Sequence, residues 1–314
     1  MNQPRKEGKR IIISEKRHDL PYSKGLMASS IMATGLPPSR AYRIAKRIED
    51  ELIEAGKFAI TIEELKNFAY EMLASDEGID YAEKYRRWRA VGRLEKPLII
   101  LIGGTTGVGK STIAAAVAHR LGITHIVASD SLREVMRSLL SKELMPTLGE
   151  STFSAWRALA SPPPPDADPV IVGFREQVAA VNVGIKAVVE RAVSEGLNLV
   201  LEGAHVVPGY FAGKFENAFI VPLIIHVDNE ERHLSHFYIR GLQTEGVRGF
   251  ERYKANFQNI RKIGDYILSL AEEHEVPVVR TGDLDSAVAE SLEIILNAVF
   301  GPQKEQKIEV GGGS

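Results

Sequence analysis

The sequence has 314 residues, 44% of them hydrophobic and 25% charged, so it is long enough for two domains with buried cores. Its 39 lysines and arginines nearly balance 41 aspartates and glutamates, which argues against the broad basic surface of a nucleic-acid-binding protein. Cysteine is absent, which excludes disulfides, thiolate catalysis and cysteine-ligated metal sites.

The first 95 residues predict a small, mainly helical domain. A short β-like run, Arg10–Ser14, comes first, and the pattern is helical from Ser23 onward. Ile44, Ile48 and Leu52 recur four residues apart among charged neighbours, as on the buried face of an amphipathic helix.

Two further helices complete this region. Thr61 is followed three residues later by Glu64, a capping-box signature that predicts a helix running to Leu73. Another helix is predicted over Tyr81–Val91, and Leu94–Lys96 forms a short junction.

Residues 96–302 predict an α/β domain in which short apolar strands alternate with helices. The expected strands are Leu98–Ile102, Thr124–Ala128, Leu197–Leu201, Leu223–Val227 and Val276–Val279. The expected helices include Ser111–Arg120, Gly173–Ser194 and Ser286–Val299. This rhythm predicts a three-layer fold with a five-stranded parallel sheet. Residues 303–314 are expected to be a flexible tail.

Between the first strand and its helix lies a phosphate-binding loop of the type G-x-x-x-x-G-K-[ST], which begins at Gly104 and ends at Ser111. Lys110 is expected to bridge the β- and γ-phosphates of a nucleotide, and Ser111 to bind Mg²⁺. The residues expected to contact the nucleotide are Gly104, Thr105, Thr106, Gly107, Val108, Gly109, Lys110, Ser111 and Thr112. The sequence has no Asn-Lys-x-Asp run for reading guanine, so ATP is favoured over GTP.

The second strand ends at Ser129-Asp130, at the sheet edge where ligands bind in such folds. Asp130 is a candidate for the catalytic base or for Mg²⁺ binding, although it is also a candidate helix cap. Arg133 is expected to open the next helix, and Arg133 and Arg137 are candidates for binding an anionic acceptor.

The third strand is followed by Glu202-Gly203-Ala204-His205. Glu202 is a candidate for orienting Mg²⁺-bound water or for serving as the base. His205 is a candidate contact for a substrate phosphate, with a purely structural role as the alternative.

A break at Gly241–Gly249 inside a charged helical stretch predicts a hinged lid. Arg240 and Arg248 flank this break, and one of them is expected to reach the transferred phosphoryl group.

These features resemble the archaeal 2-phosphoglycerate kinases. The resemblance rests on the phosphate-binding loop, on Ser129-Asp130-x-x-Arg133 with Glu202-Gly203-x-His205, and on a first region similar to an ATP-cone domain. It covers nearly the whole chain. It implies transfer of the γ-phosphoryl group of ATP to the 3-hydroxyl of 2-phosphoglycerate, which feeds cyclic 2,3-diphosphoglycerate synthesis in methanogens.

The resemblance also implies a second, regulatory nucleotide at the first domain, where a basic pair would map to Lys16 and Arg17. The other expected partner is a small phosphorylated hydroxy acid, with no nucleic acid and no membrane. No apolar segment of signal-peptide length lies near the N-terminus, so a cytoplasmic location is expected.

Two alternatives remain open at this point. One is a kinase of another substrate, similar to phosphoseryl-tRNA kinases or zeta toxins. The other is a nucleotide-sensing regulator without catalysis, against which the presence of Lys110, Ser111, Asp130 and Glu202 together argues.

Overall fold

The computed structural model describes residues 11–15, 18–92, 94–211, 215–243 and 250–301. Its first elements form a small sheet packed against four helices. The strands are β1 (Ile12–Glu15), β2 (His18–Pro21) and β3 (Ala59–Thr61), in the order β2-β1-β3. The helices are α1 (Lys24–Met32), α2 (Pro38–Glu54), α3 (Ile62–Asp76) and α4 (Ile79–Val91).

The sequence patterns explain these helices. The Ser23 side chain caps α1 by accepting from the backbone N–H of Leu26, and Thr61 and Glu64 form the predicted capping box of α3. The prediction of a mainly helical unit is confirmed. Strands β2 and β3 were not predicted, because each is only three or four residues long. The boundary at residues 95 and 96 stays a proposal, and the tail 303–314 lies outside the described residues.

The larger sheet has five parallel strands, as predicted, and their order is β5-β6-β4-β7-β8. They are β4 (Leu98–Gly103), β5 (His125–Ala128), β6 (Leu199–Glu202), β7 (Phe219–His226) and β8 (Val278–Arg280). Its helices are α5 (Lys110–Leu121), α6 (Ser129–Leu139), α7 (Pro169–Ser194), α8 (Glu230–Gln243), α9 (Phe250–Ala255), α10 (Phe257–Glu273) and α11 (Leu284–Phe300). Two short 3₁₀ helices, η1 (Pro146–Gly149) and η2 (Ala155–Ala158), lie between α6 and α7.

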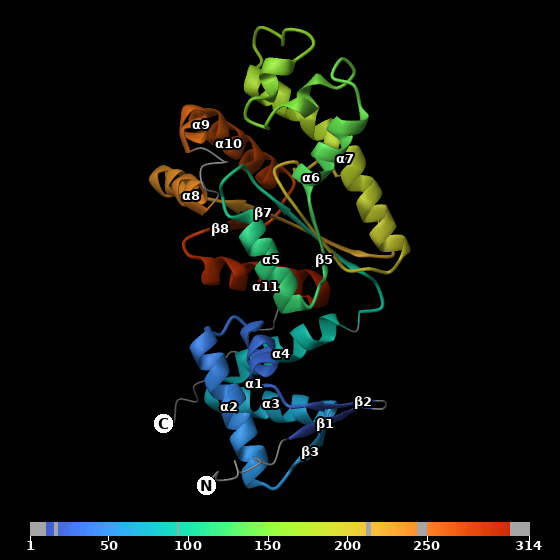
Figure 1. Cartoon of the computed structure of the whole chain (residues 1–314), viewed down its shortest axis with the longest axis vertical. Coiled ribbons are helices and arrows are strands. Elements are labelled where there is room, and N and C mark those ends of the chain that lie inside the picture. Colours follow the sequence, from blue (N-terminus) through green and yellow to red (C-terminus); the bar gives the residue numbers. More distant parts are fainter. Residues whose placement is uncertain (1–10, 16–17, 93, 212–214, 244–249, 302–314) are drawn as a thin grey trace, which may run out of the picture.

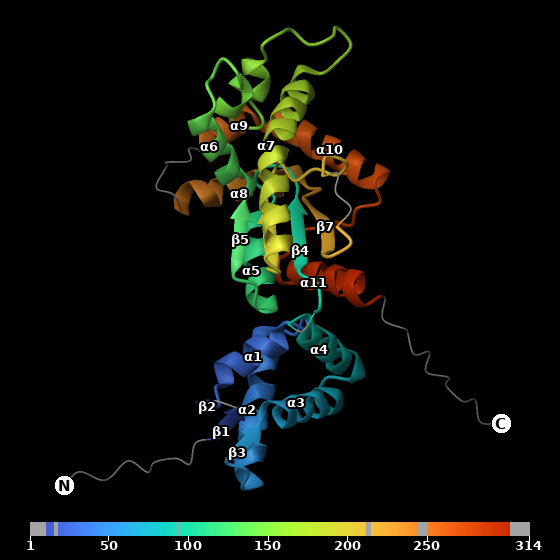
Figure 2. The ribbon, with the colours of Figure 1, turned by 90° about the vertical axis from the view of Figure 1, so that its right-hand side faces the viewer.

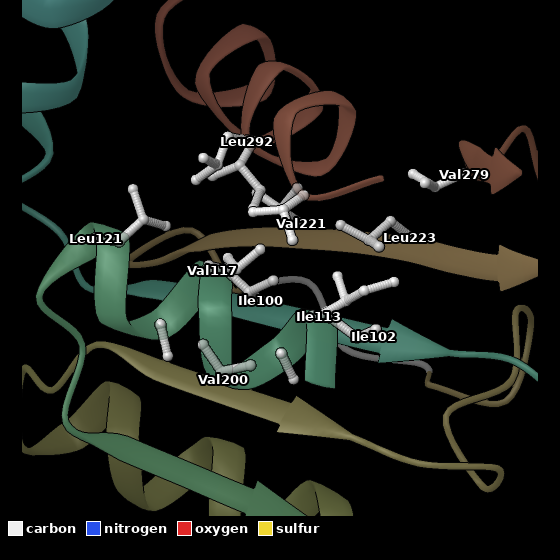
Figure 3. Close-up of a cluster of buried hydrophobic side chains, with 14 of the residues drawn as sticks. Ile100, Ile102, Ile113, Val117, Leu121, Val200, Val221, Leu223, Val279 and Leu292 are labelled. Atoms are coloured by element: carbon white, nitrogen blue, oxygen red, sulfur yellow. The ribbon is translucent and has the colours of Figure 1, made fainter. Parts of the chain in front are cut away.

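Helices cover both faces of this sheet, which gives the predicted three layers. Ile100 and Ile102 of β4 belong to the core beneath α5 and α11, which Figure 3 shows in close-up. Ile99 and Leu101 point to the opposite face and pack with α7. Every residue of β4 is buried, as expected for the central strand of a parallel sheet.

The two groups of elements are stacked along the long axis, and α4 lies at their junction (Figures 1 and 2). The indole Nε1 of Trp88 on α4 donates to the carbonyl of Arg120 at 2.6 Å, near the end of α5. The guanidinium of Arg87 donates to the carbonyls of Leu296 and Gly301 at the end of α11. Among the described residues, no helix has the length and apolar character that a membrane span requires.

Candidate active site

The phosphate-binding loop joins the central strand β4 to α5. Gly104, Gly107 and Gly109 have φ angles of 132°, 89° and 90°, which side-chain-bearing residues rarely adopt. A Cβ on Gly104 would lie 2.3 Å from the carbonyl oxygen of Ile225. The loop therefore curls tightly at the N-terminus of α5, as a cradle for phosphate requires.

Helix α8 contacts this loop through three of its side chains. His233 Nε2 lies 2.8 Å from the carbonyl of Thr106, and His236 Nδ1 lies 2.9 Å from the carbonyl of Gly107. Because a carbonyl can only accept, each of these ring nitrogens is the donor. The ring of Phe237 packs directly against Gly107. The sequence analysis missed all three aromatic side chains, although their i, i+3, i+4 spacing marks one helix face.

Replacing Gly107 with alanine is expected to lower the free energy of unfolding by about 3 kcal/mol. The new Cβ would lie 2.2 Å from Cζ of Phe237, in addition to the strain of the positive φ. Chemical denaturation without nucleotide measures the loss. Gly109→Ala is the matched control, because Gly109 has a similar φ of 90° and no atom within 4 Å of its Cβ position. Equal losses in the two variants would contradict a role for Phe237.

Lys110, Ser111 and Glu202 meet at the start of α5. The Ser111 hydroxyl donates to Oε1 of Glu202 at 2.8 Å, and Lys110 Nζ donates to the carbonyl of Thr105 at 2.7 Å. Lys110 is 8% exposed and Glu202 is 7% exposed. Burial lowers the pKa of Lys110, while the nearby carboxylates of Glu202 and Asp130 oppose that shift. Within the described residues, no group of three or more His, Cys, Asp or Glu side chains is placed to hold a metal ion.

A cavity of about 500 Å³ opens beside the loop. The Asp130 side chain is 71% exposed at its wall and makes no capping hydrogen bond, because α6 begins at Ser129 with Ala128 as its cap. The alternative of Asp130 as a helix cap is therefore wrong. The wall also includes segments from α8 and from the start of α11, namely Arg232, His236, Ile239, Thr281, Gly282, Asp283, Leu284 and Ala287. These last segments were not predicted as part of the site.

His205 does not line this cavity. It is fully buried, with Nδ1 at 2.9 Å from the Ser129 hydroxyl and Nε2 at 3.2 Å from Oε1 of Gln177. Burial lowers the pKa of His205 to about 4, so its ring is neutral at pH 7. This geometry contradicts direct contact with a substrate phosphate and favours the structural alternative, in which His205 orients the turn before Asp130.

The two predicted acceptor-binding arginines also have protein partners. Arg133 lies within α6 rather than at its start, and it donates to the carbonyls of Leu148 and Glu150 at 2.8 and 3.2 Å. Arg137 pairs with Glu134 at 2.6 Å. Neither side chain lines the cavity beside the loop.

The predicted lid falls largely outside the described residues. Arg248 lies in the undescribed segment 244–249, and the side chain of Arg240 is not described either. On the far side of this segment, the Arg252 guanidinium donates to the Ser151 hydroxyl at 2.8 Å. The next residue, Thr152, lies 3.4 Å from Thr106 of the phosphate-binding loop, hydroxyl to hydroxyl. Arg252 of α9 thus contacts the segment that touches the phosphate-binding loop, and it was not among the predicted site residues.

Stability is expected to fall as the pH falls from about 6.5 toward 4. Burial lowers the pKa of His233 from 6.5 to about 4, so the unfolded chain binds a proton in this range that the folded chain does not. His233 alone should account for about 1.5 kcal/mol between pH 6.5 and 5. Denaturation at both pH values measures this loss.

His233→Gln keeps a donor for the Thr106 carbonyl but cannot titrate, so it should weaken the pH dependence. His119→Gln, at an exposed position of α5, is the control. An unchanged pH dependence in His233→Gln would contradict the assignment.

The chain is similar to known proteins along nearly its whole length. A family model described as an AAA domain matches residues 103–161, which include the phosphate-binding loop. A 2-phosphoglycerate kinase from Methanopyrus kandleri is 39% identical over 301 residues, covering 95% of this chain and 90% of the relative. The enzymes of that name from Methanothermobacter thermautotrophicus and Pyrococcus furiosus are 42% and 36% identical. The match to the Methanothermobacter enzyme covers 88% of this chain and 90% of the relative. The match to the Pyrococcus enzyme covers 96% of this chain and 98% of the relative.

Proposed function

Because the chain belongs to the 2-phosphoglycerate kinase family, we propose that it transfers the γ-phosphoryl group of ATP to the 3-hydroxyl of 2-phosphoglycerate, giving 2,3-bisphosphoglycerate and ADP. The observation that carries this proposal is the similarity of relatives with this name along nearly the whole chain. A phosphate-binding loop at the end of the central parallel strand supports it independently.

In this proposal, residues Gly104–Thr112 hold the triphosphate of ATP. The backbone N–H groups of the loop and the N-terminus of α5 face the β- and γ-phosphates. Lys110 neutralises charge on the transferred group, and it can exchange its bond to the Thr105 carbonyl for phosphate oxygens. His233 and His236 act by positioning, since they bind the carbonyls of Thr106 and Gly107 and leave the N–H groups for the ligand.

Glu202 and Asp130 take different roles. Mg²⁺, when bound, neutralises the charge of the β- and γ-phosphates. Glu202 is buried and paired with the Ser111 hydroxyl, which suits orientation of that hydroxyl and of water on the metal side. Asp130 is exposed at the cavity wall, which suits acceptance of the proton from the attacking hydroxyl.

The acceptor carries a phosphate and a carboxylate, so its site needs at least two cations. Arg133 and Arg137 remain proposals for this role, and each would have to give up a present partner. We add Arg252 to Arg240 and Arg248 as a third candidate for the lid arginine, because its guanidinium already reaches Ser151 beside the loop.

The proposal has three further parts. They are the use of Mg²⁺, which the phosphate-binding loop implies, a cytoplasmic location, and a second nucleotide that regulates the enzyme from the first domain, which the family resemblance implies. Lys16 and Arg17, the basic pair expected at that second site, lie outside the described residues.

The test is to follow ADP release and product identity with Mg-ATP and a panel of acceptors. The panel holds 2-phosphoglycerate, 3-phosphoglycerate, glycerate, phosphoserine and tRNA, with Lys110→Ala as the blank. Turnover that depends on Lys110 and is fast only with 2-phosphoglycerate supports the proposal. Turnover with tRNA alone, or ADP release that no acceptor accelerates, would contradict it in favour of a tRNA kinase or a nucleotide sensor.

A further inference from the structure

A second cavity, of about 810 Å³, lies at the junction where α4 meets the larger sheet. Its walls come from α3 and α4 on one side, and from the start of β7 and the end of α11 on the other. Figure 2 shows α4 next to α11 at the junction of the two halves, with α3 below α4. The lining residues are Glu63, Lys66, Asn67, Tyr70, Tyr85, Arg86, Arg89, Ala90, Leu94, Glu95, Lys96, Phe219, Val299 and Phe300. None of them lines the cavity beside the phosphate-binding loop.

Tyr85 differs from the other residues of this wall because its hydroxyl is buried without a hydrogen-bond partner among the described residues. The residue is 2% exposed. Burial raises the pKa of Tyr85, so the hydroxyl keeps its proton and remains a donor. The other tyrosines nearby are satisfied: Tyr22 donates to the carbonyl of Ala45 at 2.7 Å, and Tyr70 donates to Glu83 at 2.5 Å. A buried hydroxyl without a partner is costly, which points to a partner that comes from outside the chain.

The charged side chains of the wall are predominantly cationic, with four cations, Lys66, Arg86, Arg89 and Lys96, against two carboxylates, Glu63 and Glu95. Lys66 pairs with Glu63, and Arg86 pairs with Glu83.

Arg89 and Lys96 differ from the other two cations. Arg89 donates to the Ser30 hydroxyl at 3.3 Å, and Lys96 donates to the Glu216 carbonyl at 2.7 Å. Within the described part of the chain, neither has a carboxylate partner. Glu95 is the other carboxylate of the wall, so Arg89 and Lys96 leave the wall with a net positive charge, and the buried Tyr85 hydroxyl has no partner among the described residues. A net positive wall with a hydroxyl donor suits phosphate oxygens.

The remaining wall is aromatic and aliphatic. Tyr70, Phe219 and Phe300 contribute rings, and Leu94 and Val299 contribute alkyl surface. A bare inorganic anion would leave this surface unused. An organic phosphate would cover it and place its charged end against the cations.

We propose that this junction cavity is a binding site for an organic phosphate, separate from the catalytic site. Arg89 and Lys96 bind the phosphate oxygens, and the Tyr85 hydroxyl donates one further hydrogen bond. No described residue of β1 or β2 lines the cavity. An occupant would contact α4 and α11 at once and so stabilise the contact between the two halves.

The test is isothermal titration calorimetry on the full chain with four probes: ATP, ADP, 2,3-bisphosphoglycerate and inorganic phosphate. The control protein for this titration is the double variant Arg89→Met, Lys96→Met. For at least one organic probe, the unmodified protein is expected to bind one equivalent more than this variant. Tyr85→Phe should weaken binding of the same probe at this site by about tenfold, since a hydrogen bond to a charged group is lost. The identity of the extra ligand distinguishes a nucleotide from a phosphorylated acid.

Binding at the catalytic site serves as the internal control, because the double variant should keep its single equivalent of ATP there. Tyr22→Phe is the control for Tyr85→Phe. It should destabilise the protein by removing a hydrogen bond, whereas Tyr85→Phe without ligand should be at least as stable as the unmodified protein. Identical stoichiometry and affinity for all four probes in the unmodified protein and the double variant would overturn the proposal. So would extra binding of inorganic phosphate alone, and neither result depends on whether the kinase reaction occurs.

Discussion

Replacing Lys110 with methionine is expected to reduce kcat on the order of a thousandfold while leaving the protein at least as stable as before. Lys110 is the cation of the phosphate-binding loop, and the reaction requires neutralisation of charge on the transferred group. In the absence of nucleotide, however, this charge is buried, it donates to the Thr105 carbonyl, and the carboxylates of Glu202 and Asp130 offset only part of its desolvation. Methionine fills a similar volume without that desolvation cost.

The change in kcat and the change in stability need separate measurements. Steady-state kinetics with Mg-ATP and 2-phosphoglycerate gives kcat, and thermal unfolding without ligand gives the change in stability. Lys186→Met, at an exposed position of α7 beside Glu190, is the matched control and should change neither quantity by much. A Lys110→Met protein that unfolds at a clearly lower temperature would show that the buried charge stabilises the fold, contrary to the argument above.

Glu202→Gln and Asp130→Asn are expected to impair the reaction in different ways. Gln keeps an oxygen for the Ser111 hydroxyl but loses the charge beside the metal position, so the Mg²⁺ concentration for half-maximal rate should rise about tenfold or more. Asn at position 130 cannot accept a proton, so kcat should fall about a hundredfold or more with little change in the Mg²⁺ requirement. Initial rates over a series of Mg²⁺ concentrations separate the two effects.

If Glu202→Gln lowered kcat without changing the Mg²⁺ requirement, and Asp130→Asn raised that requirement, the roles assigned to the two residues would be reversed. If Asp130→Asn instead raised KM for 2-phosphoglycerate with kcat unchanged, Asp130 would bind the acceptor rather than deprotonate it. Glu190→Gln, at an exposed position of α7 beside Lys186, is a control for nonspecific effects of losing a carboxylate charge.

Much of the fold could be predicted because its signals are local. The phosphate-binding loop is contiguous in sequence, and the five apolar strands stand between clear helical patterns. The predicted strands differ from the observed ones only at their ends. The helix predicted to start at Gly173 begins earlier, at Pro169, with Asp168 as its cap.

The site was predictable only in part, for a physical reason. Gly104–Ser111, Asp130 and Glu202 follow strands directly, and the ends of parallel strands meet at one edge of the sheet. His233, His236 and Phe237 lie in a polar helix more than 120 residues from the loop that they contact. The sequence pattern of α8 does not reveal which element packs against it. Arg133 and His205 have the residue types of ligand-binding groups, but their contacts with backbone and buried side chains depend on three-dimensional packing.

The contacts of α4 determine where the chain can be truncated without losing a stable kinase fragment. Trp88 donates to the Arg120 carbonyl in the last turn of α5, and Arg87 donates to the carbonyls of Leu296 and Gly301 at the end of α11. A truncated kinase that starts at residue 96 would lose both donors and expose the apolar surface that Trp88 covers. We expect such a fragment to aggregate, whereas one that starts at Gly78, ahead of α4, should retain its helix ends. The shortest fragment that folds on its own would therefore include α4, although α4 is part of the first region of the sequence.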